Sequence, residues 1–409
     1  MFQSAEKTNV LCLDIGTSRI TACIFQEVNH ELQLKGVSVV PQAHGSLHNG
    51  AIVNISETIA AVQEAVKQAE NKAKISAKDM VIGLSGELAK GMTVKLTSVR
   101  TEPEQEINQQ EIKSLLHELQ WQAFDTIRSN ISEELSISEI ELKLVNASVV
   151  SIQVDGERVT DPIGMKGKQI QLDIFNCFAP VQHFGQIQNI AVELPLHDLK
   201  GVFVQGFAVC HSLALNDAFA NAVVIDIGAG TTDICIISEG KILGNRSFAL
   251  AGNSITKRIA YALSTSFGEA EQVKLSYSNE TLERRSSMII REAIHDDIDI
   301  WLSSLEFSLK ELPLKNLPHN FLVSGNGAKL PEFKAALKDH PWVNMFPMTG
   351  SVEVRDLDYS DLITGDFNPD QFDPDFIPSV AVATTASDLL YNHSTLDSML
   401  STIIADKGV

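Results

Sequence analysis

The sequence predicts an α/β fold made of two related domains, and two hairpin-like stretches carry this prediction. In Val223–Ser238 (VVIDIGAGTTDICIIS) a β-branched run breaks at Asp226 and two glycines and then resumes, which is typical of strand, tight turn and strand. Val10–Phe25 (VLCLDIGTSRITACIF) repeats this arrangement around Asp14. Because one Asp-Ile-Gly turn opens each half of the chain, we expect a duplication whose halves face one ligand; a chance similarity of two hairpins is the alternative.

The residues at these turns suit a bound phosphate. Gly228 and Gly230 allow a backbone path that larger residues could not follow, so unpaired N–H groups can point at an anion. Asp226, at the end of the first strand, is placed to hold a hydrated cation that offsets the phosphate charge. A glycine-rich hairpin without a ligand is the alternative interpretation of this stretch alone.

Neither turn matches the commoner nucleotide motifs. A P-loop needs a Lys-Ser/Thr pair that leads into a helix, and the dinucleotide fingerprint needs a third glycine at a helix start. Here a second strand-like run follows each turn. The pattern resembles instead the actin-like ATPase superfamily, in which two such hairpins grip the β- and γ-phosphates from opposite sides of a cleft. The resemblance implies a duplicated, ribonuclease-H-like two-domain fold.

Two further segments extend this resemblance. Phe321–Leu330 (FLVSGNGAKL) is similar to the adenosine motif of the superfamily, a buried strand followed by glycines that let the backbone approach base and ribose. Glu269–Lys274 (EAEQVK) is similar to a helix whose acid and lysine contact ribose and adenine in relatives; a solvated helix ion pair is the alternative. The resemblance implies ATP and Mg²⁺ as cofactors and these nucleotide-binding positions: Asp14, Gly16, Thr17, Ser18, Arg19, Asp226, Gly228, Gly230, Thr231, Thr232, Asp233, Gly252, Asn253, Glu271, Lys274, Gly325, Asn326 and Gly327.

The resemblance also implies roles in metal binding and hydrolysis. Asp14 and Asp226 are expected to reach Mg²⁺ through water. In relatives a residue on the helix that connects the domains orients the attacking water, which carries over to Gln205; a structural glutamine is the alternative. Because the sequence places no histidine or glutamate as an unambiguous base, we expect slow ATP hydrolysis at most.

Between about Gly83 and Gly164 the pattern changes, and we predict an inserted α+β module there. Ile112–Arg128 has the spacing of an amphipathic helix, and Leu142–Val154 is strand-like. The phrases LSGE before the insert and PIGMKG at its end resemble the borders of the SHS2-type module of FtsA, a family of bacterial cell division. A lineage-specific decoration without a partner is the alternative.

The insert defines the predicted domains. Residues 1–82 and 165–205 form the first actin-like domain, 83–164 the module, 206–378 the second domain with a reduced small subdomain at about 254–310, and 379–409 the C-terminal helices. Between Lys274 and a predicted helix at Met288–Leu309 lies only a short connector, where FtsA relatives carry extra strands that receive FtsZ. This shortening resembles PilM, the actin-like family of type IV pilus assembly, so both assignments stay open.

These resemblances imply different partners. The FtsA type is a cytoplasmic scaffold that self-assembles into dimers or filaments and links division proteins such as FtsZ at the inner membrane. The PilM type binds the cytoplasmic peptide of a membrane-spanning partner, so either protein would be peripheral to the membrane through its partners. An actin-fold small-molecule kinase would need a catalytic Asp in a substrate domain, for which we find no candidate, and a heat-shock-type chaperone would need a further domain.

The composition, with 44% hydrophobic and 21% charged residues, is that of a globular protein. A formal net charge of −20 argues against nucleic acid as a partner, because binding phosphates needs clustered Lys and Arg. The five cysteines stand singly in apolar runs without metal-like spacing, so we expect buried thiols in a reducing cytoplasm. Neither a membrane span nor a signal peptide is predicted.

Several other segments have a predicted structure. Ser56 is expected to cap a helix that runs to about Ala73. The further elements expected are strands at Leu32–Val40, Met80–Ser85 and Ile170–Ala179, the last returning the chain to the first domain, and helices at Ile187–Val192 and Pro378–Tyr391.

Two segments near the C-terminus bear on partners. Ser351–Pro378 carries eight Asp or Glu against Arg355 and is interpreted as a solvated acidic loop, with a docking surface for a basic peptide as the alternative. An apolar stripe follows at helical spacing, made of Leu396, Met399, Leu400, Ile403 and Ile404. Because only Lys407 nearby is basic, we expect the stripe to pack on protein rather than on anionic lipid.

Overall fold

The computed structural model describes most of the chain, namely residues 8–28, 31–48, 50–84, 89–135, 140–312, 314–339, 345–348, 350–362, 376–391, 396, 399–400 and 402. The strands are β1 Thr8–Ile15, β2 Arg19–Val28, β3 Glu31–Pro41, β4 Leu47–His48, β5 Ala51–Ile52, β6 Asp79–Leu84, β7 Lys90–Val99, β8 Leu142–Val154, β9 Glu157–Arg158, β10 Gln169–Pro180, β11 Asp198–Val204, β12 Ala222–Ile227, β13 Thr232–Ser238, β14 Lys241–Phe248, β15 Asn320–Ser324 and β16 Glu353–Asp356. The α-helices are α1 Ile55–Ala73, α2 Gln109–Leu135, α3 Val181–Val192, α4 Gln205–Ala214, α5 Gly252–Leu263, α6 Phe267–Ser278, α7 Arg284–Lys310, α8 Pro331–Asp339 and α9 Ile377–Tyr391.

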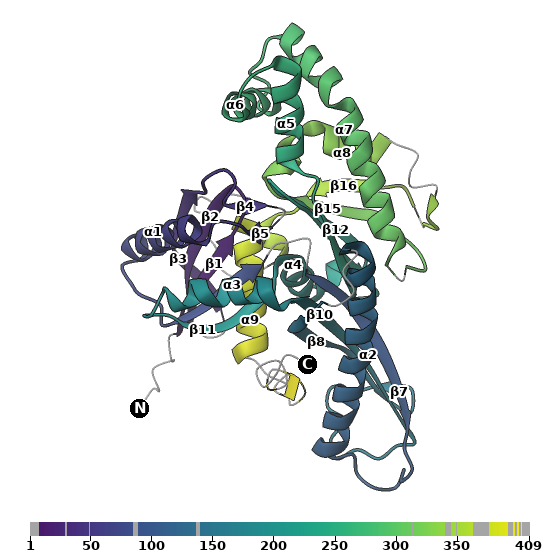
Figure 1. The fold of residues 1–409 in the computed structure, drawn as a ribbon. Coiled ribbons are helices and arrows are strands. Elements are labelled where there is room, and N and C mark those ends of the chain that lie inside the picture. The colour runs from purple at the N-terminus through teal and green to yellow at the C-terminus, as the bar shows by residue number, and fades with distance from the viewer. Residues whose placement is uncertain are drawn as a thin grey trace.

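The same strand order occurs twice. The first sheet runs β11-β6-β1-β2-β3, and the second contains β16-β15-β12-β13-β14. In each, three antiparallel strands are followed by two strands parallel to the first one, as β6 is to β1 and β15 is to β12. The repeated topology shows that the two Asp-Ile-Gly hairpins, β1–β2 and β12–β13, occupy equivalent places in two related domains (Figure 1).

The inserted module does not form a separate sheet. Its strands continue the second sheet beyond β14, in the order β14-β7-β10-β8-β9. β14 pairs with β7 at Gly244 and Asn245, and Arg246 contacts both the Gly91 carbonyl and Glu311. The junction is tight, because a Cβ at Gly91 would lie 2.3 Å from the Phe175 ring. The module therefore extends from the second domain as one nine-stranded sheet (Figure 1).

This pairing corrects the expected path of the chain at β10. We expected Ile170–Ala179 to return the chain to the first domain, but β10 lies between β7 and β8 in the module's sheet. The chain reaches the first sheet again at β11, which pairs with β6. The physical reason is that β7, β8 and β10 are long antiparallel strands that satisfy one another's backbone groups.

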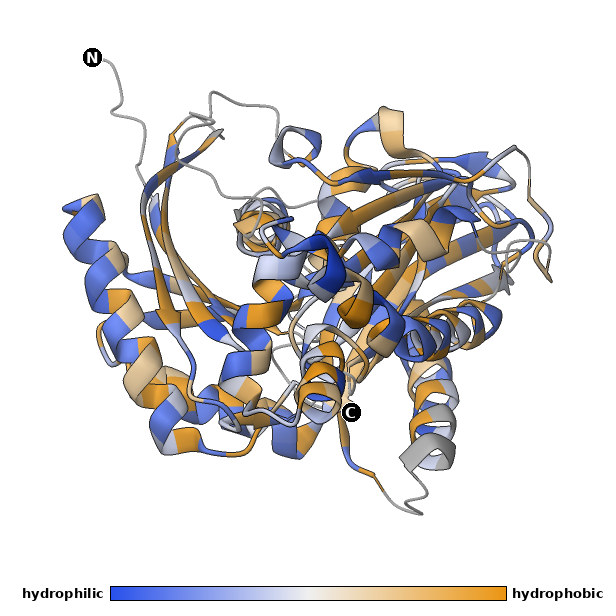
Figure 2. Ribbon diagram, turned by 90° about the horizontal axis from the view of Figure 1, so that it is seen from above, coloured by the Kyte–Doolittle hydropathy of each residue, from blue (hydrophilic) through white to orange (hydrophobic). Residues whose placement is uncertain are grey.

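Each strand hairpin of the second domain is buried on both faces, which explains its unbroken apolar sequence. Val223 and Ile225 of β12 belong to the core beneath α5, α7 and α8, whereas Val224 belongs to the core shared with the first domain. The module has a third core, formed by α2 on its sheet. In Figure 2 the helices at the surface show a hydrophilic outer side and a more hydrophobic inner side.

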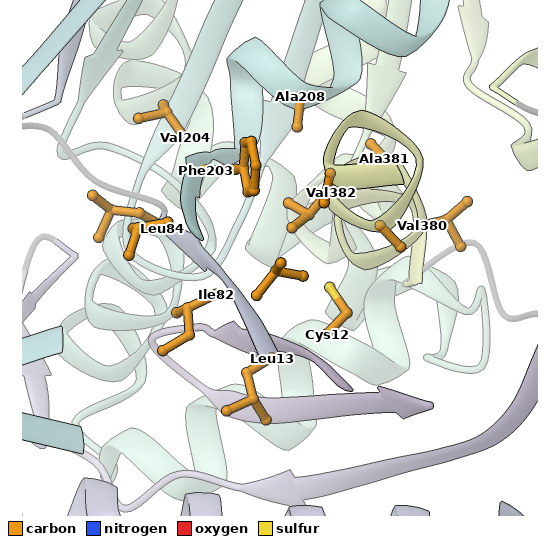
Figure 3. Close-up of a cluster of buried hydrophobic side chains, with 14 of the residues drawn as sticks. Cys12, Leu13, Ile82, Leu84, Phe203, Val204, Ala208, Val380, Ala381 and Val382 are labelled. Carbon is orange, nitrogen blue, oxygen red and sulfur yellow. The ribbon is translucent and has the colours of Figure 1, made fainter. Parts of the chain in front are cut away.

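The helix α9 packs between the first sheet and α4, which in turn contacts β13 and β14 of the second sheet. Its residues Val380 and Val382 lie against Cys12 of β1 and Ile82 of β6 in one buried cluster (Figure 3). Cys12 also donates its thiol to the Ser379 carbonyl, and α9 packs along α4. All five cysteines are buried and free, as predicted.

Some predicted ends and segments need correction. The cap of α1 is Asn54, whose side chain accepts a hydrogen bond from the Glu57 amide, whereas Ser56 lies inside the helix. The acidic stretch Ser351–Pro378 is not only a loop, because its residues 353–356 form the edge strand β16 beside β15. Residues 363–375 of that stretch, and 85–87 of the LSGE phrase, lie outside the described residues.

The apolar stripe near the C-terminus packs on the protein where it is described. Leu396 and Leu400 are fully buried in the core of the module, and Met399 lies against the same core. Ile403, Ile404 and Lys407 lie outside the described residues. Within the described ranges, no helix is both long and apolar enough to cross a bilayer.

Candidate nucleotide site

The turns of the two hairpins are built in the same way. In the first, the Gly16 amide donates to the Arg19 carbonyl at 3.0 Å, and in the second the Gly228 amide donates to the Thr231 carbonyl at 2.9 Å. The turns also touch each other, since a Cβ at Gly230 would lie 2.7 Å from the Thr17 hydroxyl. Glycine at position 230 is therefore required by the close approach of the two domains.

A small polar cavity of about 70 Å³ lies where the two turns meet. It collects most of the predicted phosphate and metal residues, together with Gly325 and Asn326 of the adenosine motif. The lining residues are Asp14, Gly16, Thr17, Ser18, Arg19, Gln205, Asp226, Gly228, Ala229, Gly230, Thr231, Asp233, Gly325, Asn326 and Pro378. We call this space the inner cavity.

Three carboxylates concentrate negative charge in the inner cavity. Burial raises the pKa of Asp14 to about 6, and the charge of Asp226 adds to the shift, although Arg19 opposes it. Burial likewise raises the pKa of Asp233 to about 7, again with Asp226 contributing. Asp226 accepts a hydrogen bond from the Ser324 hydroxyl at 2.6 Å. A cation placed among these groups would relieve their mutual repulsion.

The donor set fits a hydrated Mg²⁺ better than a metal enclosed by protein. The described part of the chain has no group of three or more His, Cys, Asp or Glu side chains that could hold a metal ion by themselves. Mg²⁺ usually keeps several waters and takes one or two carboxylates plus substrate phosphates. Asp14 and Asp226 would be those carboxylates, and the ion would supply charge neutralisation for the phosphates.

Gln205 lies in the inner cavity as the sequence implied. It is the first residue of α4, and its side-chain amide donates a hydrogen bond of 2.5 Å to Asp14 Oδ1. This bond orients the amide and leaves its oxygen as an acceptor toward the cavity. The residue can therefore both hold Asp14 in place and accept a hydrogen bond from a water molecule.

A second, larger cavity of about 510 Å³ adjoins the inner one and shares six residues with it. Its volume is within the range of small-molecule sites. It brings together Gly252, Asn253, Glu271, Lys274, Asn326 and Gly327, all predicted from the superfamily resemblance. The amides of Gly252 and Asn253 donate to the Gly228 and Ala229 carbonyls, so α5 begins directly on the second turn. We call this space the outer cavity.

The predicted Glu271–Lys274 pair is engaged with α5. The Lys274 ammonium donates to Gly252 O at 3.1 Å, to Thr256 Oγ1 at 2.8 Å and to Glu271 Oε2 at 2.8 Å, which uses all three of its donors. Glu271 also accepts from the Thr256 hydroxyl at 2.5 Å. Contact of either side chain with a nucleoside would thus replace an existing bond.

Packing explains two details that the sequence did not indicate. Gly325 and Gly327 approach the end of β12, where a Cβ would lie 2.4 Å from the Ile227 carbonyl and 2.6 Å from the Ile227 side chain respectively, so packing of the motif on the hairpin already requires these glycines. Thr232 does not line either cavity. Its hydroxyl donates to the Leu250 carbonyl and accepts from the Trp301 indole, because the side chain points into the core of the second domain.

Several residues that line the outer cavity were not predicted from the sequence. The missed lining residues, from both domains, include Gln42, His44, His48, Lys257, Phe267, Asn279 and Lys329. The His-containing segment 42–48 follows β3, and no motif in the sequence marks it as part of a site. Its contribution depends on the first domain bringing this loop opposite α6.

Comparison with known proteins agrees with this geometry. The family model described as cell division protein FtsA matches residues 223–358. FtsA of Pseudomonas aeruginosa is 25% identical over 272 residues, which cover 66% of this chain and 61% of that protein. FtsA of Bacillus subtilis is 24% identical over 358 residues, covering 80% of this chain and 75% of that protein.

Among solved structures, a chain of the PilM–PilN type IV pilus biogenesis complex has a TM-score of 0.67 at 18% identity, over 92% of this chain and 98% of that chain. The chain has the actin-like ATPase fold and resembles FtsA. The ethanolamine utilization protein EutJ of Carboxydothermus hydrogenoformans is a more distant neighbour in structure, with a TM-score of 0.50 and 13% identity. The predicted actin-like fold is thereby confirmed, with FtsA nearer in sequence and PilM similar in structure.

Replacing Asp14 by Asn is expected to stabilise the actin-like fold at pH 8 when nucleotide and Mg²⁺ are absent. The folded pKa of about 6 lies above the ordinary value of 3.8, so the folded state loses stability as pH rises from about 4 to about 6. Asparagine keeps an acceptor for Gln205 but carries no charge. Urea denaturation with EDTA should show a gain on the order of 2–3 kcal/mol at pH 8 that shrinks toward pH 4.

The matched control is Asp125→Asn on the exposed side of α2, which is expected to change stability by less than about 0.5 kcal/mol at either pH. A loss of stability in Asp14→Asn at pH 8 would contradict the assigned buried, ionised carboxylate.

Proposed function

We propose that this protein binds Mg·ATP between its two domains. The observation that carries the proposal is the meeting of two equivalent hairpin turns over one buried group of carboxylates, beside a cavity large enough for a nucleoside. The turn amides around Gly16–Ser18 and Gly228–Thr231 hold the phosphates. Asp14 and Asp226 hold the metal ion through water, and the nucleoside lies in the outer cavity.

We expect slow hydrolysis of ATP at most. Gln205 is the residue placed to orient a water molecule, but an amide cannot accept a proton as a general base. Asp14 is engaged by this same amide and by the cation. The proposed role of nucleotide is therefore to set the conformation of the protein rather than to supply rapid turnover.

Loss of either metal carboxylate should weaken nucleotide binding. Asp14→Asn and Asp226→Asn are each expected to raise the Kd for Mg·ATP by roughly 30- to 150-fold, as for a lost charge-assisted contact of about 2–3 kcal/mol. Isothermal titration calorimetry at pH 8 measures this directly. Asp14→Asn is informative because the same variant should be more stable without ligand, so its weaker binding cannot be explained by unfolding.

Asp125→Asn is again the control and should bind Mg·ATP like the wild type. Unchanged affinity in both cavity variants would eliminate the proposed metal position.

We further propose an FtsA-type role, in which the protein self-assembles and links cell division proteins at the inner membrane. The match of the FtsA family model to the second domain and the alignment with FtsA proteins support it. The inserted module and neighbouring faces are the proposed contacts for ATP-dependent self-association. Nucleic acid is not among the proposed partners, since the net charge is −20.

A PilM-like role is the second candidate, and two observations favour it. The small subdomain consists of α5, α6 and α7 without a strand anywhere in the fully described stretch 252–310, so the extra strands expected for an FtsZ contact are missing there. A cavity of about 260 Å³ lies between β8 of the module and β11, α3 and α9 of the first domain. Its apolar wall is formed by Phe184, Leu389 and Leu390. The Lys143 ammonium lies over the Phe184 ring in a cation–π contact. This cavity suits a partner peptide with apolar and acidic residues.

Under either role we expect membrane contact through partners rather than through the described C-terminal residues. Vesicles of phosphatidylglycerol should not retain the protein at high salt in a co-sedimentation assay, because Leu396 and Leu400 are buried in the module. Replacing both by Ala should instead lower the free energy of unfolding, by about 2–5 kcal/mol for each leucine.

Two results together would show instead that these residues tether the protein to the membrane. The wild type would bind vesicles at high salt, and the double variant would lose this binding without any change in stability.

A further inference from the structure

An aromatic contact joins the two domains at the outer cavity. The ring of His44, on the loop after β3 in the first domain, lies against the ring of Phe267 at the start of α6 in the second domain, with centroids 4.2 Å apart and planes inclined by 54°. Both residues line the outer cavity. They belong to opposite domains, as the hairpin turns do, but they meet on the nucleoside side of the site.

On the first domain, the loop that carries His44 is fixed to the phosphate turn. The Gln42 amide donates to the Ser18 carbonyl at 2.9 Å, and its side chain donates to the Gly16 carbonyl at 3.3 Å. Two residues after His44, the Ser46 hydroxyl donates to Glu57 at the start of α1. A displacement of the first turn is therefore transmitted to His44 through short bonds.

On the second domain, Phe267 is fixed to the nucleoside side of the cavity. Ser266 and Glu269 form a capping box around the start of α6, so the first turn of this helix is held rigidly. The same helix carries Glu271 and Lys274, which line the outer cavity. Phe267 therefore moves together with the part of the second domain that faces a bound nucleoside.

We propose that His44 and Phe267 form a clasp that must open for a nucleotide to enter or leave the outer cavity. The clasp deepens the proposed Mg·ATP site and rests on it. Its closed form is the contact seen here, and its opening requires the two domains to separate on the nucleoside side while Thr17 and Gly230 keep the turns together. The two rings thereby govern how long the nucleotide is retained.

The size of the effect follows from the strength of ring contacts. An aromatic pair of this kind changes an opening equilibrium by roughly 2- to 10-fold. The release rate of nucleotide should rise by that factor when either ring is removed. Each single variant already removes the contact between the two rings. Removing the second ring as well should therefore increase the release rate little further.

The test is stopped-flow release of the N-methylanthraniloyl derivative of ATP with Mg²⁺, chased by excess ATP. His44→Ala and Phe267→Ala should each speed release roughly 2- to 10-fold, and the double variant should match the faster single variant. The control is His117→Ala, which removes an exposed histidine on α2, outside both cavities, and should leave release unchanged. Unchanged rates in the single variants, or a double variant whose effect is the product of the two, would overturn the clasp.

A cysteine pair provides an independent measurement. The double variant His44→Cys, Phe267→Cys places one accessible thiol on each domain at the outer cavity, whereas all five native cysteines are buried. Bridging the pair with a short bismaleimide should proceed faster with Mg·ATP present and should slow nucleotide release at least about 10-fold. Bridged protein that releases nucleotide as fast as unbridged protein would refute the clasp.

The two levels of the proposal fail differently. If the wild type does not bind the labelled nucleotide at all, the Mg·ATP site and the clasp are both wrong. If binding is normal and depends on Asp14 and Asp226, but the ring variants behave like His117→Ala, only the clasp is wrong.

Discussion

Three carboxylates from two domains share one buried space, and the rest of the arrangement depends on this constraint. Asp14 ends β1, and Asp226 and Asp233 lie across from each other on β12 and β13. Duplication of one strand order places them together, and the close contact of Thr17 with Gly230 holds the two turns against each other. Such a group is unfavourable when ionised without a counter-charge. The protein is therefore a pair of domains whose junction becomes favourable when a cation and its phosphates fill it.

The continuous second sheet links the junction of the two domains to the inserted module. Because β14 pairs with β7, the module is tied to the second domain through backbone bonds as well as through the Arg246 guanidinium, which donates to the Gly91 carbonyl. The module is also joined to the first domain, because the Asn146 side chain of β8 donates to the Val202 carbonyl and accepts from the Val204 amide of β11. A motion of the second domain against the first would therefore act on the module from both sides. The same motion would alter the cavity between β8 and the first domain, where a partner peptide is proposed to bind. In the proposed account, nucleotide binding, the clasp and the partner surface are therefore coupled through the relative position of the two domains.

The sequence was sufficient for the hairpins, because the alternation of apolar residues, the Asp-Ile-Gly turns and the glycines act locally. The residues of the site that lie outside the turns, such as Gln205, Glu271 and Lys274, were expected only from the resemblance to the superfamily. The sequence failed where partners are distant along the chain. The assignment of β10 to the module's sheet depends on pairing with β7 and β8, which no local pattern specifies. The position of His44 opposite Phe267 depends on how two domains meet. Thr232 was misassigned because the buried Trp301 indole, 69 residues further along, takes its hydroxyl as an acceptor.

Proton release on nucleotide binding tests the central claim most directly. At pH 6.5 a large part of Asp233, with its pKa of about 7, and a smaller part of Asp14, with its pKa of about 6, carry a proton in the free protein. A divalent cation among these groups must displace those protons. Titration calorimetry of Mg·ATP in buffers of different ionisation enthalpy should therefore show release of about one proton at pH 6.5 and almost none at pH 8.5. Binding without proton release at pH 6.5 would show that the cation does not enter the carboxylate cluster and would contradict this account.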